Sequence, residues 1–294
     1  ISEGCNWRCG YCAIPLIRGP HVSVPMETLE EEARKLAAAG VRELIVIAQD
    51  TTYYGLDLYG RRMLAELLRR LCRIDGIEWV RLHYAYPAAF PEDVVEAMAS
   101  EPKICKYLDI PFQHISDAQL AAMHRRHTKA EALALVGRLR AAIPDLALRT
   151  TLLVGYPGET EADFAELVEF VREVRFERLG VFAYSEEEGT YSARELRDDV
   201  PEAVKQERVE RIMALQRDLS LENNMRRVGR VERVVIDSRQ GDYYVGRTQY
   251  DSPEVDQEIL IPAAERRLVR GRFYDVGIER ASDYDLYGRV VPRR

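Results

Sequence analysis

The chain has 294 residues, of which 47% are hydrophobic and 31% are charged, and its formal net charge is −7. These values are typical of a soluble globular protein with one large core and room for a small second domain. The net negative charge argues against strong nucleic-acid binding, and no apolar run approaches the ~20 residues that a bilayer crossing requires. We therefore expect a cytoplasmic protein with no membrane contact and no strong nucleic-acid binding.

Three cysteines lie close together near the start of the chain. Cys5, Cys9 and Cys12 have the spacing CxxxCxxC, which is compact enough to hold one inorganic cluster. A four-iron cluster usually takes four thiolates, so three local thiolates leave one iron open. In radical enzymes an open iron chelates S-adenosylmethionine, and an electron from the cluster then breaks the sulfonium bond. The spacing therefore predicts a 4Fe-4S cluster with three Cys ligands and one open iron.

Zinc is the alternative interpretation of these three thiols. Structural zinc needs four ligands and usually pairs one CxxC with a second, distant pair. The other sulfurs, Cys72 and Cys105, stand alone in apolar surroundings, and only His21 could complete a Cys3His set. We favour the cluster, and we interpret Cys72 and Cys105 as small core residues.

Short β-branched runs alternate with amphipathic helical patterns after the cysteines, which is typical of βα units and a parallel sheet. Counting a first strand at residues 1–3, we expect six parallel strands, the other five lying at residues 42–50, 79–86, 107–113, 146–156 and 178–185. Helices are predicted at residues 26–39, 62–72, 91–99, 117–124, 129–143 and 161–174. Six strands are too few to close an eight-stranded barrel. The predicted fold class is therefore α/β, with an open partial (β/α)6 barrel.

Polar residues follow the predicted strands, where a parallel barrel usually carries its chemistry. Gln49, Gln113 and Arg149 lie at or beside these strand ends. In an arbitrary barrel each of these would more often be a hydrogen-bonded cap than a ligand. Near a zwitterionic cofactor, however, such amides and a guanidinium could bind its carboxylate and ribose. Because the cysteine loop follows the first strand, we expect these residues and the cysteines to face a common cavity.

A glycine-rich segment, residues 155–160, follows the fifth predicted strand and opens a helix. Its glycines would let the backbone approach a ligand, and the helix amino terminus would favour an anion. The simpler interpretation is a turn followed by a capping box from Thr160 to Asp163.

The chain changes character after a polar helix predicted at residues 201–226. Short strands separated by glycine turns are expected at residues 231–236, 243–248, 257–261 and 271–279, which indicates a small all-β barrel. We therefore divide the chain into a first domain, 1–227, and a second, 228–294. From Gly229 onward there are twelve Arg, no Lys and twelve acidic residues, so the second domain is neutral.

Four segments together resemble the methylthiotransferase family of radical SAM enzymes: residues 1–19, with Tyr11 in CxxxCxΦC, and residues 48–55, 108–117 and 154–164. The terminal region resembles a TRAM domain. Residues 49–55 and 182–190 are more similar to the branch that modifies a ribosomal protein than to the branch that modifies transfer RNA. The neutral second domain agrees, because a module that grips RNA phosphates would be basic, whereas an acid-rich one suits a basic protein.

The resemblance implies a reaction and its cofactors. A methylthio group would be added to the β-carbon of an aspartate in a small-subunit ribosomal protein. One S-adenosylmethionine would donate the methyl group, a second would supply the radical, and a flavodoxin or ferredoxin would donate the electron. The residues thereby expected near S-adenosylmethionine are Tyr11, Gln49, Gln113, Arg149, Gly155 and Glu159.

The resemblance also implies a second 4Fe-4S cluster, held by an amino-terminal domain of the family. Since Ile1 stands almost directly before the cysteine loop, we expect that domain to be absent from this chain. Such a fragment would cleave S-adenosylmethionine without completing methylthiolation.

Two alternatives stay open at this point. The first is methylthiolation of an adenosine in transfer RNA, which would show as binding that weakens steeply with added salt. The second is a zinc-stabilised binding module without catalysis, which metal analysis would separate from an iron protein.

Overall fold

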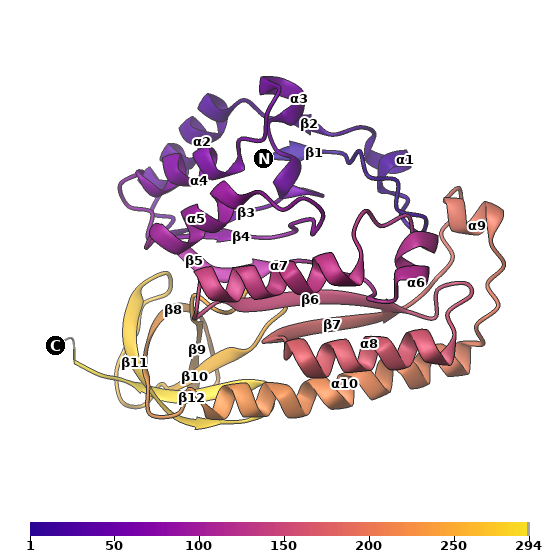
Figure 1. Ribbon diagram of the computed structural model, residues 1–294. Helices are drawn as coiled ribbons and strands as arrows, with labels where there is room; N and C mark the ends of the chain where they lie inside the picture. Colours follow the sequence, from indigo (N-terminus) through magenta and orange to yellow (C-terminus); the bar gives the residue numbers. More distant parts are fainter. Residues whose placement is uncertain (293–294) are drawn as a thin grey trace.

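A computed structural model describes residues 1–292 (Figure 1). Its larger part is a parallel sheet in the order β3-β4-β5-β6-β7, so neighbouring strands are consecutive in sequence and helices lie on the crossovers. The bounds are β3 Glu43–Val46, β4 Trp79–Leu82, β5 Ile104–Asp109, β6 Ala147–Val154 and β7 Arg178–Ala183. The open α/β architecture expected from the sequence is confirmed.

The predicted count of six parallel strands was wrong. The first strand, β1 (Ser2–Glu3), pairs antiparallel with β2 (Val22–Ser23) in a separate two-stranded sheet. It still lies beside the end of β3, because the amino group of Ile1 donates to the carbonyl of Ile47 at 3.1 Å. A strand of two residues carries too little pattern to reveal its pairing partner.

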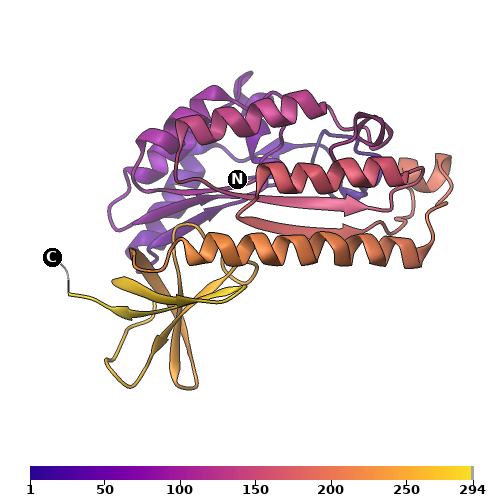
Figure 2. The ribbon, with the colours of Figure 1, turned by 60° about the horizontal axis from the view of Figure 1, so that its bottom comes forward.

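Helices cover the outer face of the sheet (Figures 1 and 2). The helix α8 shows why they do so: it buries Phe164, Leu167, Val171 and Val174, spaced three or four residues apart, against the sheet. Its amino terminus is the predicted capping box from Thr160 to Asp163. The long helices are α2 Met26–Ala38, α4 Leu64–Cys72, α5 Glu92–Ser100, α7 Lys129–Ala142, α8 Glu161–Val174 and α10 Glu202–Met225. The short ones are α1 Ile14–Arg18, η1 Thr51–Tyr53, α3 Leu56–Tyr59, α6 Asp117–Ala122 and α9 Tyr191–Glu195.

The second domain is a closed five-stranded barrel in the order β10-β12-β11-β8-β9, with its own apolar core. This confirms the predicted small all-β barrel. The strand β12, which contains Gly288, was not predicted, because a glycine in the middle of a short run resembles a turn. The bounds are β8 Val231–Gln240, β9 Tyr243–Arg247, β10 Glu258–Pro262, β11 Phe273–Ala281 and β12 Asp285–Val290.

The helix α10 joins the two domains and lies along β7, as the orange helix in Figure 2 shows. It buries polar side chains that bind backbone groups of both domains. Gln216 donates to the carbonyl of Phe176 at 3.0 Å, and Asn224 donates to the carbonyl of Ser282 at 3.0 Å. These bonds explain how a helix without an apolar stripe packs firmly.

The barrel of the second domain packs against the amino ends of the parallel strands, at the opposite end from the cysteine loop (Figure 1). Trp79 and Tyr107 from the sheet contact Val235, Tyr250 and Phe273 from the second domain. Within residues 1–292, no helix combines the length and the apolar character that a membrane crossing requires.

Candidate functional site

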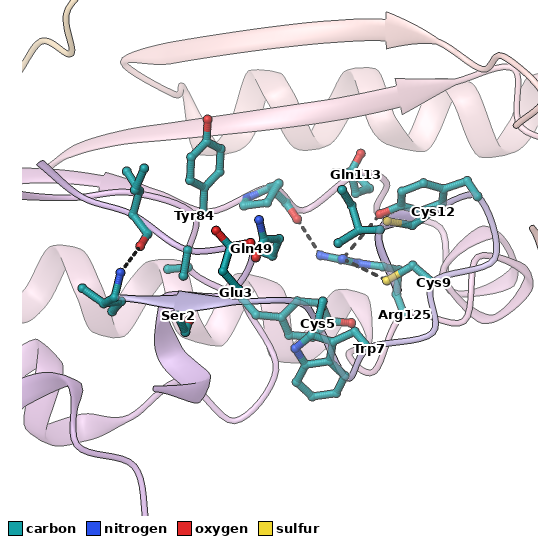
Figure 3. Close-up of a pocket in the computed structure, with 18 residues that line it drawn as sticks. Ser2, Glu3, Cys5, Trp7, Cys9, Cys12, Gln49, Tyr84, Gln113 and Arg125 are labelled. Atoms are coloured by element: carbon teal, nitrogen blue, oxygen red, sulfur yellow. Dashed lines mark hydrogen bonds between the residues drawn. The ribbon is translucent and has the colours of Figure 1, made fainter. Parts of the chain in front are cut away.

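A cavity of about 550 Å³ opens at the carboxyl ends of β3, β4 and β5 (Figure 3). Its size is ordinary for a site that binds a small molecule. All three motif cysteines line it, as the sequence predicted. Its other walls come from β1, from the segments after the three strands, and from the segment after α6: Ile1, Ser2, Glu3, Trp7, Tyr11, Ile14, Ile47, Ala48, Gln49, Tyr84, Ala85, Tyr86, Pro111, Gln113 and Arg125.

The cysteine loop is held by backbone hydrogen bonds on several sides. Cys5 donates its N–H to the carbonyl of Gly19 at 3.1 Å, and Gly10 donates to the carbonyl of Met123 at 2.9 Å. The carbonyl of Gly10 accepts from the backbone N–H of Ser192 at 2.9 Å. A Cβ at Gly10 would lie 2.6 Å from the Tyr156 hydroxyl, so only glycine fits there. These bonds hold the backbone of the loop, whereas the three sulfurs do not converge into a metal-ligand group within residues 1–292.

The thiols suit an iron-sulfur cluster better than zinc. All three are partly exposed, and Figure 3 shows them along one side of the cavity. His21, the fourth ligand of the zinc alternative, is buried instead beside Ser23, with its Nε2 3.1 Å from the Ser23 hydroxyl. Burial raises the pKa of the Cys5 thiol to about 11 and also raises that of Cys12. Cluster binding must therefore displace protons from these sulfurs.

Two of the predicted polar residues, Gln49 and Gln113, lie in the cavity wall with the cysteines. Gln113 has a φ of 69°, and its backbone bonds to Thr151 and Leu153 of β6 at 2.9 and 2.7 Å. Tyr84, also in the wall, has a φ of 54°. Non-glycine residues in this region cost free energy and gather at functional sites, where the surrounding structure holds them.

Aromatic side chains form one wall, including the predicted Tyr11. Trp7 stacks on Tyr86 with ring centroids 4.0 Å apart, and its indole N–H donates to Asp50 Oδ2 at 2.6 Å. Burial raises the pKa of Tyr86 to about 12, and it also raises the pKa of Tyr11. Both phenols therefore remain neutral at physiological pH. They offer hydrogen-bonding hydroxyl groups in an otherwise apolar wall.

Arg125 also lines the cavity, although no local sequence pattern marks it as a site residue. It follows α6 rather than a strand, and only the tertiary fold brings it beside the cysteine loop. Its Nη1 lies 3.6 Å from the Cys9 sulfur and 3.5 Å from the Tyr11 hydroxyl.

Arg149 does not line the cavity. Its Nη1 donates to Asp109 at 3.1 Å, and its Nε lies 3.5 Å from Asp256 of the second domain. The expected contact with a cofactor carboxylate is replaced by these two protein carboxylates. Arg149 therefore helps to join the sheet to the second domain.

Gly155 and Glu159 also lie outside the cavity lining. The Gly155 N–H donates to the Glu159 carboxylate, which is buried and lies 3.3 Å from Arg208 of α10. The segment is thus a turn that anchors α10, in agreement with the simpler interpretation of its sequence. A Cβ at Gly155 would lie 2.3 Å from Lys205 Cγ, and the φ of 72° favours glycine in any case.

Comparisons with known proteins agree with this architecture. Residues 1–171 match the radical SAM superfamily, and residues 228–291 match the TRAM domain. The chain is 57% identical over 291 residues to "Ribosomal protein uS12 methylthiotransferase RimO" of Christiangramia forsetii, covering 99% of this chain and 64% of that protein. It is 55% identical over 292 residues to the protein of the same name in Porphyromonas gingivalis, covering 99% of this chain and 67% of that one. The chain thus spans about two thirds of the length of these relatives.

Among solved structures, coproporphyrinogen III oxidase of Escherichia coli, described as a radical SAM enzyme, shares the fold. The TM-score is 0.52 with 17% identity, over 76% of this chain and 59% of that one. At this identity the likeness concerns the fold alone.

Proposed function

Since this chain belongs to the RimO family of radical SAM methylthiotransferases, we propose that it is the catalytic core that acts on an aspartate of ribosomal protein uS12. The observation that carries the proposal is the shared cavity: three motif thiols, two amides and an aromatic wall face one space of suitable size. The reaction is the addition of a methylthio group to the aspartate β-carbon.

In this proposal Cys5, Cys9 and Cys12 hold a 4Fe-4S cluster with one open iron. When bound, the cluster supplies the electron that cleaves S-adenosylmethionine. The backbone of the loop that carries the thiols is bonded to residues at α1, α6 and α9, and the side chains of the three cysteines turn toward the cluster when it binds.

Gln49 and Gln113 take the role of orienting the polar groups of S-adenosylmethionine. Their carboxamides offer both donors and acceptors, which match the amino, carboxylate and ribose groups of that cofactor. Trp7 and Tyr86 exclude water from the wall behind them, since their stacked rings cover it. Tyr84, which is half exposed and lines the cavity, lies where the side chain of a target would enter.

The partners follow from the same proposal. The substrate is the ribosomal protein, the electron donor is a small redox protein such as a flavodoxin or ferredoxin, and the reaction takes place in the cytoplasm. Completing the reaction requires a second 4Fe-4S cluster, which the sequence resemblance assigns to a further domain. We therefore propose that residues 1–294 alone cleave S-adenosylmethionine and transfer a β-hydrogen of the aspartate to the 5′-deoxyadenosyl radical. The β-carbon radical left on the aspartate then takes one electron from the redox donor and one proton from water, so no methylthiolated product is released.

The test uses a peptide from uS12 whose target aspartate carries deuterium on its β-carbon. The protein is reconstituted anaerobically with iron and sulfide, reduced, and incubated with S-adenosylmethionine and the peptide. We expect deuterium in the 5′-deoxyadenosine that forms, because hydrogen abstraction transfers it there. A peptide with β-deuterated glutamate at the same position is the matched control and should transfer none.

A transfer-RNA anticodon stem-loop provides the competing substrate. Deuterium transfer from a labelled adenosine of this RNA, with none from the peptide, would show that the substrate is transfer RNA and not the ribosomal protein. A colourless protein with one zinc and no iron after reconstitution would refute the radical function altogether.

A further inference from the structure

We infer that Arg125 is a positioning residue that donates a charge-assisted hydrogen bond to the Cys9 sulfur and thereby raises the reduction potential of the bound cluster. This inference deepens the proposed function and rests on the cluster that it assigns to the three cysteines. The hydrogen bond to the sulfur is supported by a distance: Arg125 Nη1 lies 3.6 Å from the Cys9 sulfur, and a dashed line marks this contact in Figure 3.

The guanidinium is held in this position from several sides. Its Nη2 donates to the carbonyl of Pro111 at 2.6 Å, and its carbon lies 4.3 Å from the centre of the Tyr86 ring. The backbone N–H of Arg125 donates to the carbonyl of Leu120 at 2.8 Å, which fixes the residue at the end of α6. Because Met123 in the same turn accepts from Gly10 of the cysteine loop, Arg125 and Cys9 are fixed relative to each other.

Arg125 is also a buried cation that lacks an acidic partner among the described residues. Arg125 is only 8% exposed, its Nε has no hydrogen-bond partner, and within residues 1–292 the printed partners of its Nη atoms are the Cys9 sulfur, the Tyr11 hydroxyl and the Pro111 carbonyl, none of them a carboxylate. Buried charges in proteins are normally paired, because desolvation of a lone charge is costly. The missing anion is supplied by the thiolates and the cluster that they would hold. In the described cavity wall, Arg125 is the only residue with a basic side chain.

A cation at this position has a definite electrical effect. Reduction adds one negative charge to the cluster, and a nearby positive charge stabilises the reduced form more than the oxidised form. Hydrogen bonds to cluster sulfurs act in the same direction. Arg125 therefore makes the cluster easier to reduce, which matters because S-adenosylmethionine is cleaved only after reduction.

The experiment compares the wild-type chain with four variants after anaerobic reconstitution. Arg125→Met and Arg125→Gln remove the charge, and Arg125→Lys keeps it without the planar donor group. Arg126→Met is the matched control, because Arg126 is exposed and removing it changes the net charge equally. Iron content and folding are measured first. The midpoint potential of each cluster is then determined by a redox titration followed by electron paramagnetic resonance.

We expect the wild type and Arg126→Met to share one midpoint potential, both neutral Arg125 variants to shift to a more negative value, and Arg125→Lys to fall between. A residue that only packed the loop would lower iron content without moving the potential of the remaining clusters. Of Arg125→Met and Arg125→Gln, the variant that retains more iron is the one compared with the wild type. If its cluster has the wild-type midpoint potential, the inference is wrong. A wild-type protein that binds no iron refutes the proposed function instead, so the two failures are distinguishable.

Discussion

Arg178, the first residue of β7, forms a buried ion pair with Asp251, which lies in the loop between β9 and β10 of the second domain. The Arg178 Nε donates to Asp251 Oδ1 at 3.2 Å, and the Asp251 side chain is fully buried. Arg227 adds a second cation 3.5 Å from the other carboxylate oxygen. The two domains are therefore joined by charges that water does not screen.

Replacing Asp251 with asparagine should destabilise the protein strongly. The change leaves two buried guanidinium groups without their anion, for which a loss of about 3 to 5 kcal/mol in the free energy of unfolding is expected. Urea unfolding measures it. Glu265→Gln is the control, because Glu265 pairs with Arg289 at the surface and such pairs contribute about 0 to 1 kcal/mol. If both variants lose a similarly small free energy of unfolding, the buried ion pairs of Asp251 do not stabilise the contact between the domains.

The same carboxylate predicts how stability depends on pH. Burial alone would raise the pKa of Asp251, but Arg178 and Arg227 outweigh burial and hold it below its ordinary value. The unfolded chain then binds a proton at higher pH than the folded one. Stability is therefore fully present above the unfolded pKa, about 3.9, and falls as the pH drops below it. Urea midpoints between pH 3 and 6 should fall at the acid end in the wild type and fall less in Asp251→Asn.

Two glycines should respond in opposite ways to alanine. Gly10→Ala would place a Cβ against the Tyr156 hydroxyl and should disturb the cysteine loop, so that reconstituted iron falls by more than half.

Gly137 lies in α7 with no atom within 4 Å of its Cβ position, so Gly137→Ala should add about 0.5 to 1 kcal/mol of stability. Iron analysis and thermal unfolding test the pair. Full iron binding by Gly10→Ala would show that the loop adapts more easily than its contacts suggest.

Gln49→Ala should weaken the binding of S-adenosylmethionine to the reconstituted protein. Losing one hydrogen bond of about 1 to 1.4 kcal/mol raises the dissociation constant about five- to tenfold. Gln206→Ala is the matched control, because Gln206 is exposed on α10 and pairs with Glu202. Equilibrium binding of S-adenosylmethionine under anaerobic conditions measures both variants. Equal dissociation constants for Gln49→Ala and Gln206→Ala would show that Gln49 does not bind the cofactor.

The sequence predicted the parts of the fold that depend on local pattern. The five parallel strands from β3 to β7 follow β-branched runs, and the boundaries of α8 follow its capping box and apolar spacing. The cysteines were identifiable because three thiols within eight residues form a local signature. The pairing of β1 was mispredicted because two residues carry no periodicity.

The rest of the site depends on contacts between distant segments. Arg149 flanks a strand end, as a cofactor ligand would, but its partner Asp256 comes from the second domain and could not be inferred from strand position. Arg125 was missed for the opposite reason: nothing in its neighbourhood marks it until α6 is packed on the cysteine loop. The sequence therefore shows clusters of functional residues that lie close together along the chain. Which distant residue a charged side chain pairs with can be determined only from the fold.

In the proposed function, Cys5, Cys9 and Cys12 hold the cluster on which S-adenosylmethionine cleavage depends. The most direct measurement is iron content together with 5′-deoxyadenosine formation after anaerobic reconstitution and reduction. It compares the wild type, the triple alanine variant of these residues, and a double alanine variant of the buried Cys72 and Cys105. We expect about four irons and 5′-deoxyadenosine in the wild type and the double variant, and neither in the triple variant. Iron and 5′-deoxyadenosine at wild-type levels in the triple variant would contradict it.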